Sequence, residues 1–258
     1  MFGLSFFERK RYNKRDVLYT AVRGLSKRDS GPKGEGRKQM NQEQVKKTEE
    51  FLKAKLQESA YFTENPAAGE YRLQHSYRVA NIGKEIAERE GFDVTEMVIA
   101  CLLHDVSYCV DFKEENDWLN HGRNAAKIAR PFLEELGLPK ERIEDICYGI
   151  AIHVDDKADF EGERTPFAES IGDADNIDRF DAYRIYETLE KGNFSALSFE
   201  EKSEKVEATL EKLHKYEEMK LGTKTAEEIW KQRIAYYISF YEKLEKQLKN
   251  STEIAGIL

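Results

Sequence analysis

The 258-residue sequence has no run of eighteen or more apolar residues, so we expect no segment of it to span a membrane. Its first residues, MFGLSFFERKR, include an apolar patch that is too short and too close to the start for a secretory signal. Cysteine is scarce, and Cys101, Cys109 and Cys147 are an odd number at no zinc-like spacing. The composition therefore predicts a reduced, cytoplasmic protein whose cysteines are small buried apolar residues.

Sustained alternation of apolar and polar residues, the pattern of β-strands, is absent from the sequence, and so is any internal repeat. Apolar residues instead recur at helical spacing through most of the chain after Met40. Val79, Ile82 and Ile86 follow His75 at offsets of 4, 7 and 11, which places all four side chains on one face of a helix. The sequence therefore predicts an all-α protein.

Eight helices are expected, and the segment 94–104 is apolar enough to be a central, buried one. Pro131 predicts a kink or a boundary in its helix, and Thr225 with Glu228 predicts a capping box at the start of the last helix. Residues 105–120 and 154–166 are expected to be irregular. The expected helices span residues 41–59, 71–90, 94–104, 121–137, 138–153, 166–192, 198–219 and 225–249.

Charge is distributed unevenly along the chain. Residues 1–40 contain 11 Lys and Arg against 4 Asp and Glu, whereas the remainder contains 30 against 45. The acidic remainder argues against nucleic acid as the main partner. The basic beginning, residues 1–39, is suited to an arm that contacts an anionic surface.

A second interpretation of residues 1–39 stays open. Met40 follows Gly-Glu-Gly-Arg-Lys-Gln, whose codons can be rich in purines, as a bacterial ribosome-binding sequence is. On this interpretation the natural start is Met40 and the residues before it are a translated leader. The nucleotide sequence is the check, because a leader requires a purine-rich ribosome site before codon 40.

Four of the five histidines lie at expected helix ends or on apolar helix faces. His75 lies within a helix, His121 begins one, and His104 and His153 each end one. An inward histidine costs stability unless its nitrogens find partners, and several converging helices can share one metal ion. Imidazoles and carboxylates suit divalent Mn, Fe, Co, Ni or Zn, and Mg is a further candidate.

Each of these polar residues also has a simpler interpretation. Taken singly, His121 and His153 are typical of hydrogen-bonded core histidines, and Arg78, Arg123 and Lys127 of solvated helix charges. The fifth histidine, at position 214, lies in a charged helix and is expected at the surface. The ordered set of motifs, rather than any single histidine, favours a metal site.

That ordered set resembles the HD superfamily of metal-dependent phosphohydrolases over about residues 71–185. The segment TAEEIWKQRIAYYISFYEKL also resembles the closing helix of small bacterial members. The resemblance implies an HD-type helical bundle over residues 40–258, a single globular domain with extra C-terminal helices at about 198–249. The motifs are HSYRVANIG at 75–83, ACLLHDV at 100–106, NHGRNAA at 120–126, IAIH at 150–153 and IGDADNID at 171–178.

The resemblance also implies roles for individual residues. Four residues match the ligands of the main metal site, and two further histidines match a second metal site, bridged by Asp105, or a contact to the phosphate. Asp175 is preferred over Asp173 because it follows the alanine of the family's usual ending. The matching residues are His75, His104, Asp105 and Asp175 for the main site, and His121 and His153 for the second.

The implied activity is metal-assisted hydrolysis of a phosphate ester or anhydride, with a nucleotide or related small molecule as substrate. His104 and Asp105 would be the catalytic residues, with Asp105 ligating the metal and orienting water. Arg78, Arg123 and Lys127 are expected to bind the phosphate, since Arg78 lies three residues after His75 and the other two follow His121 by less than two turns.

The sequence departs from two branches of the family. Tyr108 and Cys109 stand where members that hydrolyse guanosine tetraphosphate carry an acidic pair, and the Gly-Tyr-Pro extension of cyclic-dinucleotide phosphodiesterases is absent. Two other functions remain open. The first is a di-iron oxygenase of the same fold acting on a small organic substrate, and the second is a non-catalytic ligand sensor, whose ligand set would be expected to be incomplete.

Overall fold

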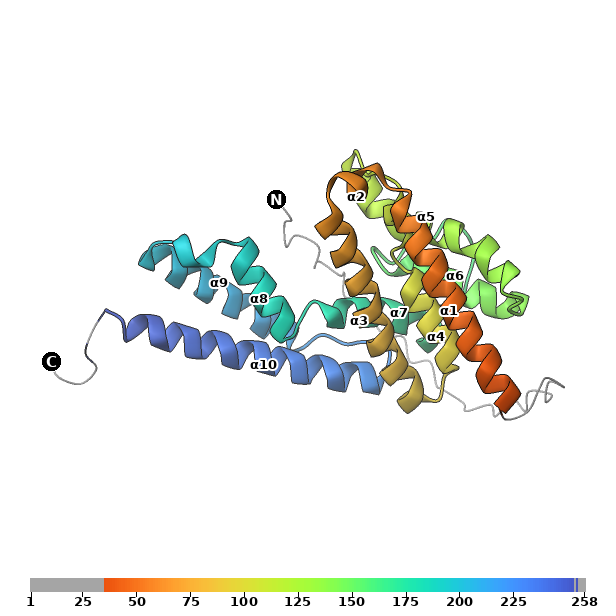
Figure 1. Cartoon of the computed structure of the whole chain (residues 1–258). Helices are drawn as coiled ribbons and strands as arrows, with labels where there is room; N and C mark the ends of the chain where they lie inside the picture. Colours follow the sequence, from red (N-terminus) through yellow and green to blue (C-terminus); the bar gives the residue numbers. More distant parts are fainter. Residues whose placement is uncertain (1–34, 253, 255–258) are drawn as a thin grey trace.

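The computed structural model describes residues 35–252 and 254, and these residues form helices and connecting segments with no strand (Figure 1). The predicted all-α class is therefore confirmed. The helices are α1 (Glu35–Gln57), α2 (Ala60–Glu64), α3 (Pro66–Glu90), α4 (Val94–Leu103), α5 (Glu115–Glu135), α6 (Lys140–Ile152), α7 (Pro166–Asp178), α8 (Ala182–Lys191), α9 (Phe199–Tyr216) and α10 (Lys224–Lys249), with 3₁₀ segments η1 (Val106–Cys109) and η2 (Phe194–Ala196).

Helix α4 is the centre of the bundle, as the sequence predicts. Asp93 caps its first turn by accepting a hydrogen bond from the N–H of Glu96 at 3.1 Å. After its first turn the helix is apolar on all sides, and it contacts α1, α3, α6 and α7. Met97, Ile99 and Leu103 are fully buried, and each such side chain contributes about 1.5–3 kcal/mol to stability.

The C-terminal helices α8, α9 and α10 extend to one side of the bundle that α1 and α3–α7 form (Figure 1). Helix α10 contacts both α9 and α7. The indole N–H of Trp230 donates to the carbonyl oxygen of Tyr216 at 2.8 Å, and its ring packs against Phe180 at 4.9 Å between centroids. Arg233 of α10 donates to the carbonyl oxygen of Ile177 at 3.1 Å, and this hydrogen bond holds the end of α7 against α10.

The expected helix over 166–192 is divided in two by residues 179–181. Asp181 has an extended backbone, and its side chain accepts a hydrogen bond from the N–H of Ala182 at 2.7 Å. This local bond starts a new helix, α8, in a new direction. The sequence prediction missed the break because aspartate favours helix starts but does not by itself exclude a helix interior.

Other details of the helices also differ from expectation. Helix α5 begins at Glu115, within the segment 105–120 that was expected to be irregular. Helix α5 continues through Pro131, which is exposed, so water can replace the backbone hydrogen bond that proline removes. The last helix is capped by Thr223, whose hydroxyl accepts from the N–H of Ala226, and not by Thr225. Glu228, the expected partner of Thr225, instead pairs with Arg89 of α3.

No described helix is both long enough and apolar enough to cross a membrane. Residues 1–34, most of the predicted basic segment, lie outside the described residues, and residues 35–39 form the first part of α1.

Candidate metal centre

Two histidines stand at the ends of helices that point to the same place. His104 follows the last residue of α4 and His153 follows the last residue of α6. The last carbonyl groups of a helix have no partner in the helix, so they accept from these side chains. The Nδ1 atom of His104 lies 2.7 Å from the carbonyl oxygen of Cys101, and Nδ1 of His153 lies 2.7 Å from that of Ile150.

The other two histidines are oriented through the same ring atom. His121, in the second turn of α5, places Nδ1 2.5 Å from the carbonyl oxygen of Trp118. His75, in the middle of α3, places Nδ1 2.8 Å from Oδ2 of Asp178. Carbonyl and ionised carboxylate oxygens only accept, so all four Nδ1 atoms carry the hydrogen and each neutral ring keeps a free electron pair on Nε2.

The four Nε2 atoms turn toward one another in two pairs. Those of His75 and His104 are 3.2 Å apart, and those of His121 and His153 are 3.0 Å apart. Asp105 lies between the pairs, with Oδ2 3.5 Å from Nε2 of His75 and Oδ1 3.2 Å from Nε2 of His121. Electron pairs that face each other at these distances repel, and a cation between them, either a metal ion or a proton, removes the repulsion.

The donors of this centre fit a metal ion. Asp175 on α7 places Oδ1 3.2 Å from Nε2 of His75. Asp105 Oδ1 is buried and has no hydrogen-bonding partner among residues 35–252, which is costly unless a cation satisfies it. Two buried sets have ligand atoms within 4.8 Å of one another and could hold an ion: His75, His104 and Asp175, and His104, Asp105 and His153.

The charges of the centre are coupled. Burial alone would favour the neutral acid at Asp105, but His104 and Arg72 outweigh it and hold the pKa of Asp105 well below its usual range. Burial is likewise outweighed at Asp175, whose pKa is lowered by Arg179 and His75. At His75 burial disfavours the charged form, yet hydrogen bonds to the surrounding aspartates prevail and raise its pKa to about 10.

Arg72 is a residue of the centre that the sequence analysis missed. Its side chain is 16% exposed, its Nη1 forms an ion pair with Oδ2 of Asp105, and its guanidinium lies 3.6 Å above the ring of Tyr108. The signal was available, because Arg72 precedes His75 by three residues and therefore shares its face of α3. It was missed because no motif in the sequence contains it.

Each of the three predicted phosphate-binding residues is paired with other groups of the protein. Arg78 donates from Nε to Oδ1 of Asp178 at 2.8 Å. Arg123 is buried and donates to Asn120, Asp155 and the carbonyl oxygens of Leu119 and Lys157. Lys127 is exposed and pairs with Asp159 at 2.6 Å.

Asp173, the alternative to Asp175, is directed elsewhere. Its Oδ2 accepts a hydrogen bond from the N–H of Gly222 at 2.7 Å, which ties α7 to the segment before α10. Of the two aspartates, only Asp175 lies among the histidines. The geometry therefore favours the preferred assignment.

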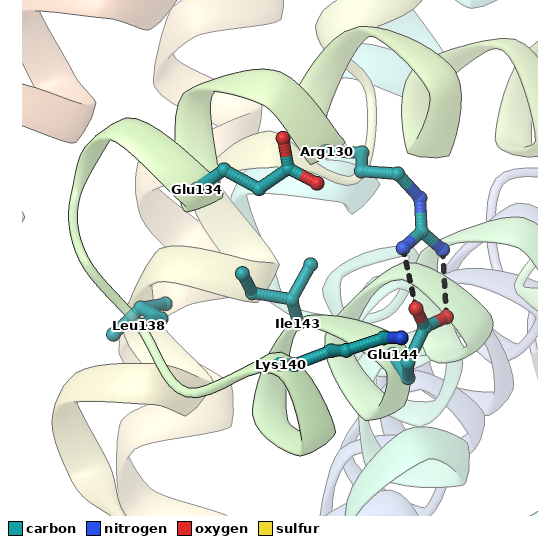
Figure 2. Close-up of a pocket in the computed structure, with 6 residues that line it drawn as sticks. All are labelled: Arg130, Glu134, Leu138, Lys140, Ile143 and Glu144. Atoms are coloured by element: carbon teal, nitrogen blue, oxygen red, sulfur yellow. Dashed lines mark hydrogen bonds and ion pairs between the residues drawn. The ribbon is translucent and has the colours of Figure 1, made fainter.

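Two surface hollows lie apart from this centre. One lies between α5 and α6, where Arg130 and Glu144 face each other and form two hydrogen bonds, at 2.7 and 2.9 Å (Figure 2). Another is lined by His214 and its neighbours on α9, and His214 is exposed and lies 3.0 Å from Glu217. None of the six predicted ligands lines either hollow.

A family model described as the HD domain matches residues 72–182. Three solved structures are also similar. An HD-superfamily hydrolase from Bacillus thuringiensis is 23% identical, with a TM-score of 0.59, and the match covers 81% of this chain and 98% of that one. A predicted HD-superfamily hydrolase from an uncultured Thermotogales bacterium is 19% identical, with a TM-score of 0.52 and coverage of 77% and 91%.

The third structure is YpgQ from Bacillus subtilis in complex with ADP, 17% identical, with a TM-score of 0.50 and coverage of 84% of this chain and 98% of that one. At these identities the likeness shows the fold. No curated protein matches the chain.

Proposed function

Residues 72–182 of this chain match the HD domain, and from this likeness we infer that the protein is a metal-dependent phosphohydrolase acting on a phosphate ester or anhydride of a small molecule. One observation carries the proposal. Four imidazole Nε2 atoms and two ionised carboxylates converge in a buried centre that needs a cation. Nucleotides are the proposed substrate class.

The metal ligands of the proposal are the residues that converge. His75, His104, Asp105 and Asp175 would hold the main ion, and His121 and His153 would hold a second ion or contact the phosphate, with Asp105 shared. When bound there, a divalent ion supplies Lewis acidity and lowers the pKa of a water molecule.

Asp105 has the central role among the protein's own groups. It lies between the two histidine pairs, and its Oδ1 atom has an accepting position that no residue in 35–252 uses. An ionised carboxylate at that position orients the attacking water by accepting a hydrogen bond from it. His104 would hold the main ion together with Asp105, since its Nε2 atom lies 3.4 Å from Oδ2 of Asp105.

Arg72 is the cation best placed to bind the phosphate. Its Nη1 atom is paired with Asp105, but its buried Nε atom has no hydrogen-bonding partner among residues 35–252 and can donate to a phosphoryl oxygen, and the ring of Tyr108 fixes the plane of the guanidinium. Negative charge that develops on the phosphoryl group is offset by this side chain without rearrangement. Phosphate binding by Arg78, Arg123 and Lys127 stays a prediction, since aspartates already occupy their donors.

Two observations support nucleotides as the substrate class. The similar YpgQ structure contains ADP. In this chain, Tyr108, Phe112 and Trp118 pack as an aromatic group beside His121, and Trp118 is exposed. An exposed aromatic ring next to the proposed phosphate position offers a surface on which a nucleobase can stack.

The test is metal analysis of the purified protein, followed by measurement of phosphate release from a set of nucleotides. We expect one to two equivalents of transition metal and release of phosphate. Asp105→Asn should remove metal and lower the rate at least about a hundredfold, the scale of losing one charge-stabilising group. Glu144→Gln, the same chemical change at the hollow between α5 and α6, should leave both unchanged.

Three results would overturn the proposal. If the protein binds no metal and releases no phosphate, both the proposed metal centre and the proposed activity are wrong. Iron with oxygen consumption in place of phosphate release would assign the same six donors to the di-iron oxygenase. Bound metal with neither reaction would assign them to a ligand sensor.

A further inference from the structure

Asp178 is a buried carboxylate that the proposed reaction does not use. Its side chain is 3% exposed, and it stands on α7 one turn after Asp175. Its Oδ2 atom accepts the Nδ1 hydrogen of His75 at 2.8 Å, on the side of the ring that faces away from the other histidines. Asp178 therefore contacts a proposed ligand without belonging to either set that could hold an ion.

His75 differs from the other three histidines in taking the acceptor for its Nδ1 atom from a different helix. His104 and His153 end their helices and use the free carbonyl oxygens of the last turn. His75 lies in the middle of α3, where the carbonyl groups are engaged in helical hydrogen bonds. His121 also lies within its helix and turns Nδ1 to the carbonyl oxygen of Trp118 in that helix, whereas the acceptor for Nδ1 of His75 comes from α7.

Arg78 holds Asp178 in place. It donates from Nε to Oδ1 at 2.8 Å and from Nη2 to Oδ2 at 3.2 Å, a two-point contact that fixes the plane of the carboxylate. The guanidinium in turn lies 4.6 Å from the ring centre of Tyr183 on α8. A chain of contacts therefore orients His75: Tyr183 of α8 contacts Arg78, Arg78 holds Asp178 of α7, and Asp178 accepts the hydrogen of His75.

We propose that Asp178, clamped by Arg78, is a positioning residue that fixes His75 in the form with hydrogen on Nδ1, so that Nε2 is presented to the metal ion. The inference rests on the metal centre of the proposed function. Among the four histidines of the centre, His75 alone is oriented by a charged group, which makes it the strongest electron donor of the set. The predicted role of Arg78 changes accordingly, from binding substrate to orienting Asp178.

The test measures the dissociation constant of Zn²⁺ by competition with a chelator in the full chain. Asp178→Asn keeps the shape of the side chain but removes its charge, and we expect affinity to fall about 10–100-fold. Glu187→Gln is the matched control. Glu187 is also a buried carboxylate held by an arginine, Arg184 at 2.7 Å, but no histidine contacts it among the described residues, so its loss should leave Zn²⁺ affinity unchanged.

A second measurement separates positioning from folding. Nitrogen-15 NMR of the histidine rings in the Zn²⁺-loaded wild type should show His75 with hydrogen on Nδ1 only, whereas Asp178→Ala should show a mixture of ring forms while the other three histidines are unchanged. Arg78→Lys removes the two-point contact and should weaken Zn²⁺ binding less than Asp178→Asn does. It also provides the test if the Asp178 variants do not fold.

The outcomes that overturn the inference are specific. Folded Asp178→Asn with wild-type Zn²⁺ affinity and an unchanged His75 signal would refute it. Arg78→Lys with a raised KM and unchanged Zn²⁺ affinity would return Arg78 to substrate binding. A wild type that binds no Zn²⁺ would refute the metal centre itself, and a wild type that binds Zn²⁺ without phosphate release would refute only the hydrolase.

Discussion

The four histidines of the centre differ in how each ring is held. Three of them donate from Nδ1 to a backbone carbonyl oxygen three residues earlier in the chain, a bond that local sequence alone can make. His75 depends on Asp178, which lies 103 residues away in the sequence. Local hydrogen bonds preset three of the rings, whereas the fourth is set only when α3 and α7 pack together.

His75 also predicts how stability depends on pH in protein stripped of metal. Its pKa is about 10 in the folded state, because hydrogen bonds to Asp105, Asp175 and Asp178 outweigh burial, and about 6.5 in the unfolded chain. A raised folded-state pKa contributes stability that is complete below pH 6.5 and is lost as the pH rises toward 10. The melting temperature should therefore fall across this range.

The measurement is thermal unfolding of chelator-treated protein at several pH values. His75→Asn serves as the control, since it removes the titrating ring, and its melting temperature should change less between pH 6.5 and 10. Equal slopes for the two proteins would show that His75 does not carry the pH dependence.

At the scale of elements, the close approach of α6 and α7 sets the position of Asp175. A Cβ atom built on Gly149 would lie 2.5 Å from Cδ1 of Ile171 and 2.7 Å from the carbonyl oxygen of Ala168. Only glycine allows the two helices to be this close. The distance between α6 and α7 matters for the proposed function, because His153 follows the end of α6 and Asp175 lies on α7, and both are proposed metal ligands.

Gly149→Ala should therefore destabilise the protein by about 1–3 kcal/mol, the cost of overpacking, even though alanine is the better helix former. Chemical denaturation measures the change in the free energy of unfolding. Ile171→Val removes the nearest atom, so it should cost less in the Gly149→Ala background than in the wild type. A variant as stable as the wild type would mean that the helices separate without penalty.

Element boundaries were the least predictable feature. By local sequence alone, Thr223 and Thr225 could each cap α10. Thr223 is the cap in the structure, where the preceding residue, Gly222, donates its N–H to Asp173 of α7 and so fixes where the helix begins. The break at 179–181 is similar, because the carbonyl oxygens at the end of α7 are satisfied by Arg233, which is distant in the sequence. Local patterns find the helices but do not fix where they stop.

At the scale of the whole molecule, the six proposed ligands of the centre all lie between residues 75 and 175. Residues 38–40 of α1 are exposed, and the first buried side chains of that helix are Thr48 and Leu52. The chain 40–258 should therefore fold with a melting temperature within a few degrees of the full chain and retain the same one to two equivalents of metal.

Thermal unfolding and metal analysis of the two proteins, purified side by side, check this expectation. A matched control is the chain 53–258, which removes Thr48 and Leu52 and should lose cooperative unfolding because α4 is then uncovered on one side. If the chain 40–258 bound less metal than the full chain, residues 1–39 would contribute to the centre.

The sequence by itself determined the class of the fold, most of the helices and which polar residues converge. Apolar residues at helical spacing specify faces that must be buried, and histidines on those faces or at helix ends must then meet inside. That reasoning singled out His75, His104, His121 and His153, and the resemblance to the HD superfamily added Asp105 and Asp175.

Only the tertiary structure decided the roles of the charged residues around them. An arginine on a helix is equally compatible with solvent, an aspartate or a phosphate, because its long side chain reaches whatever lies nearest. Packing of α3 against α7 directs Arg78 to Asp178, and packing near η1 places Arg72 between Asp105 and Tyr108. The helical period determines which face of its helix a residue occupies, but the packing of helices distant in the sequence determines which side chains it contacts.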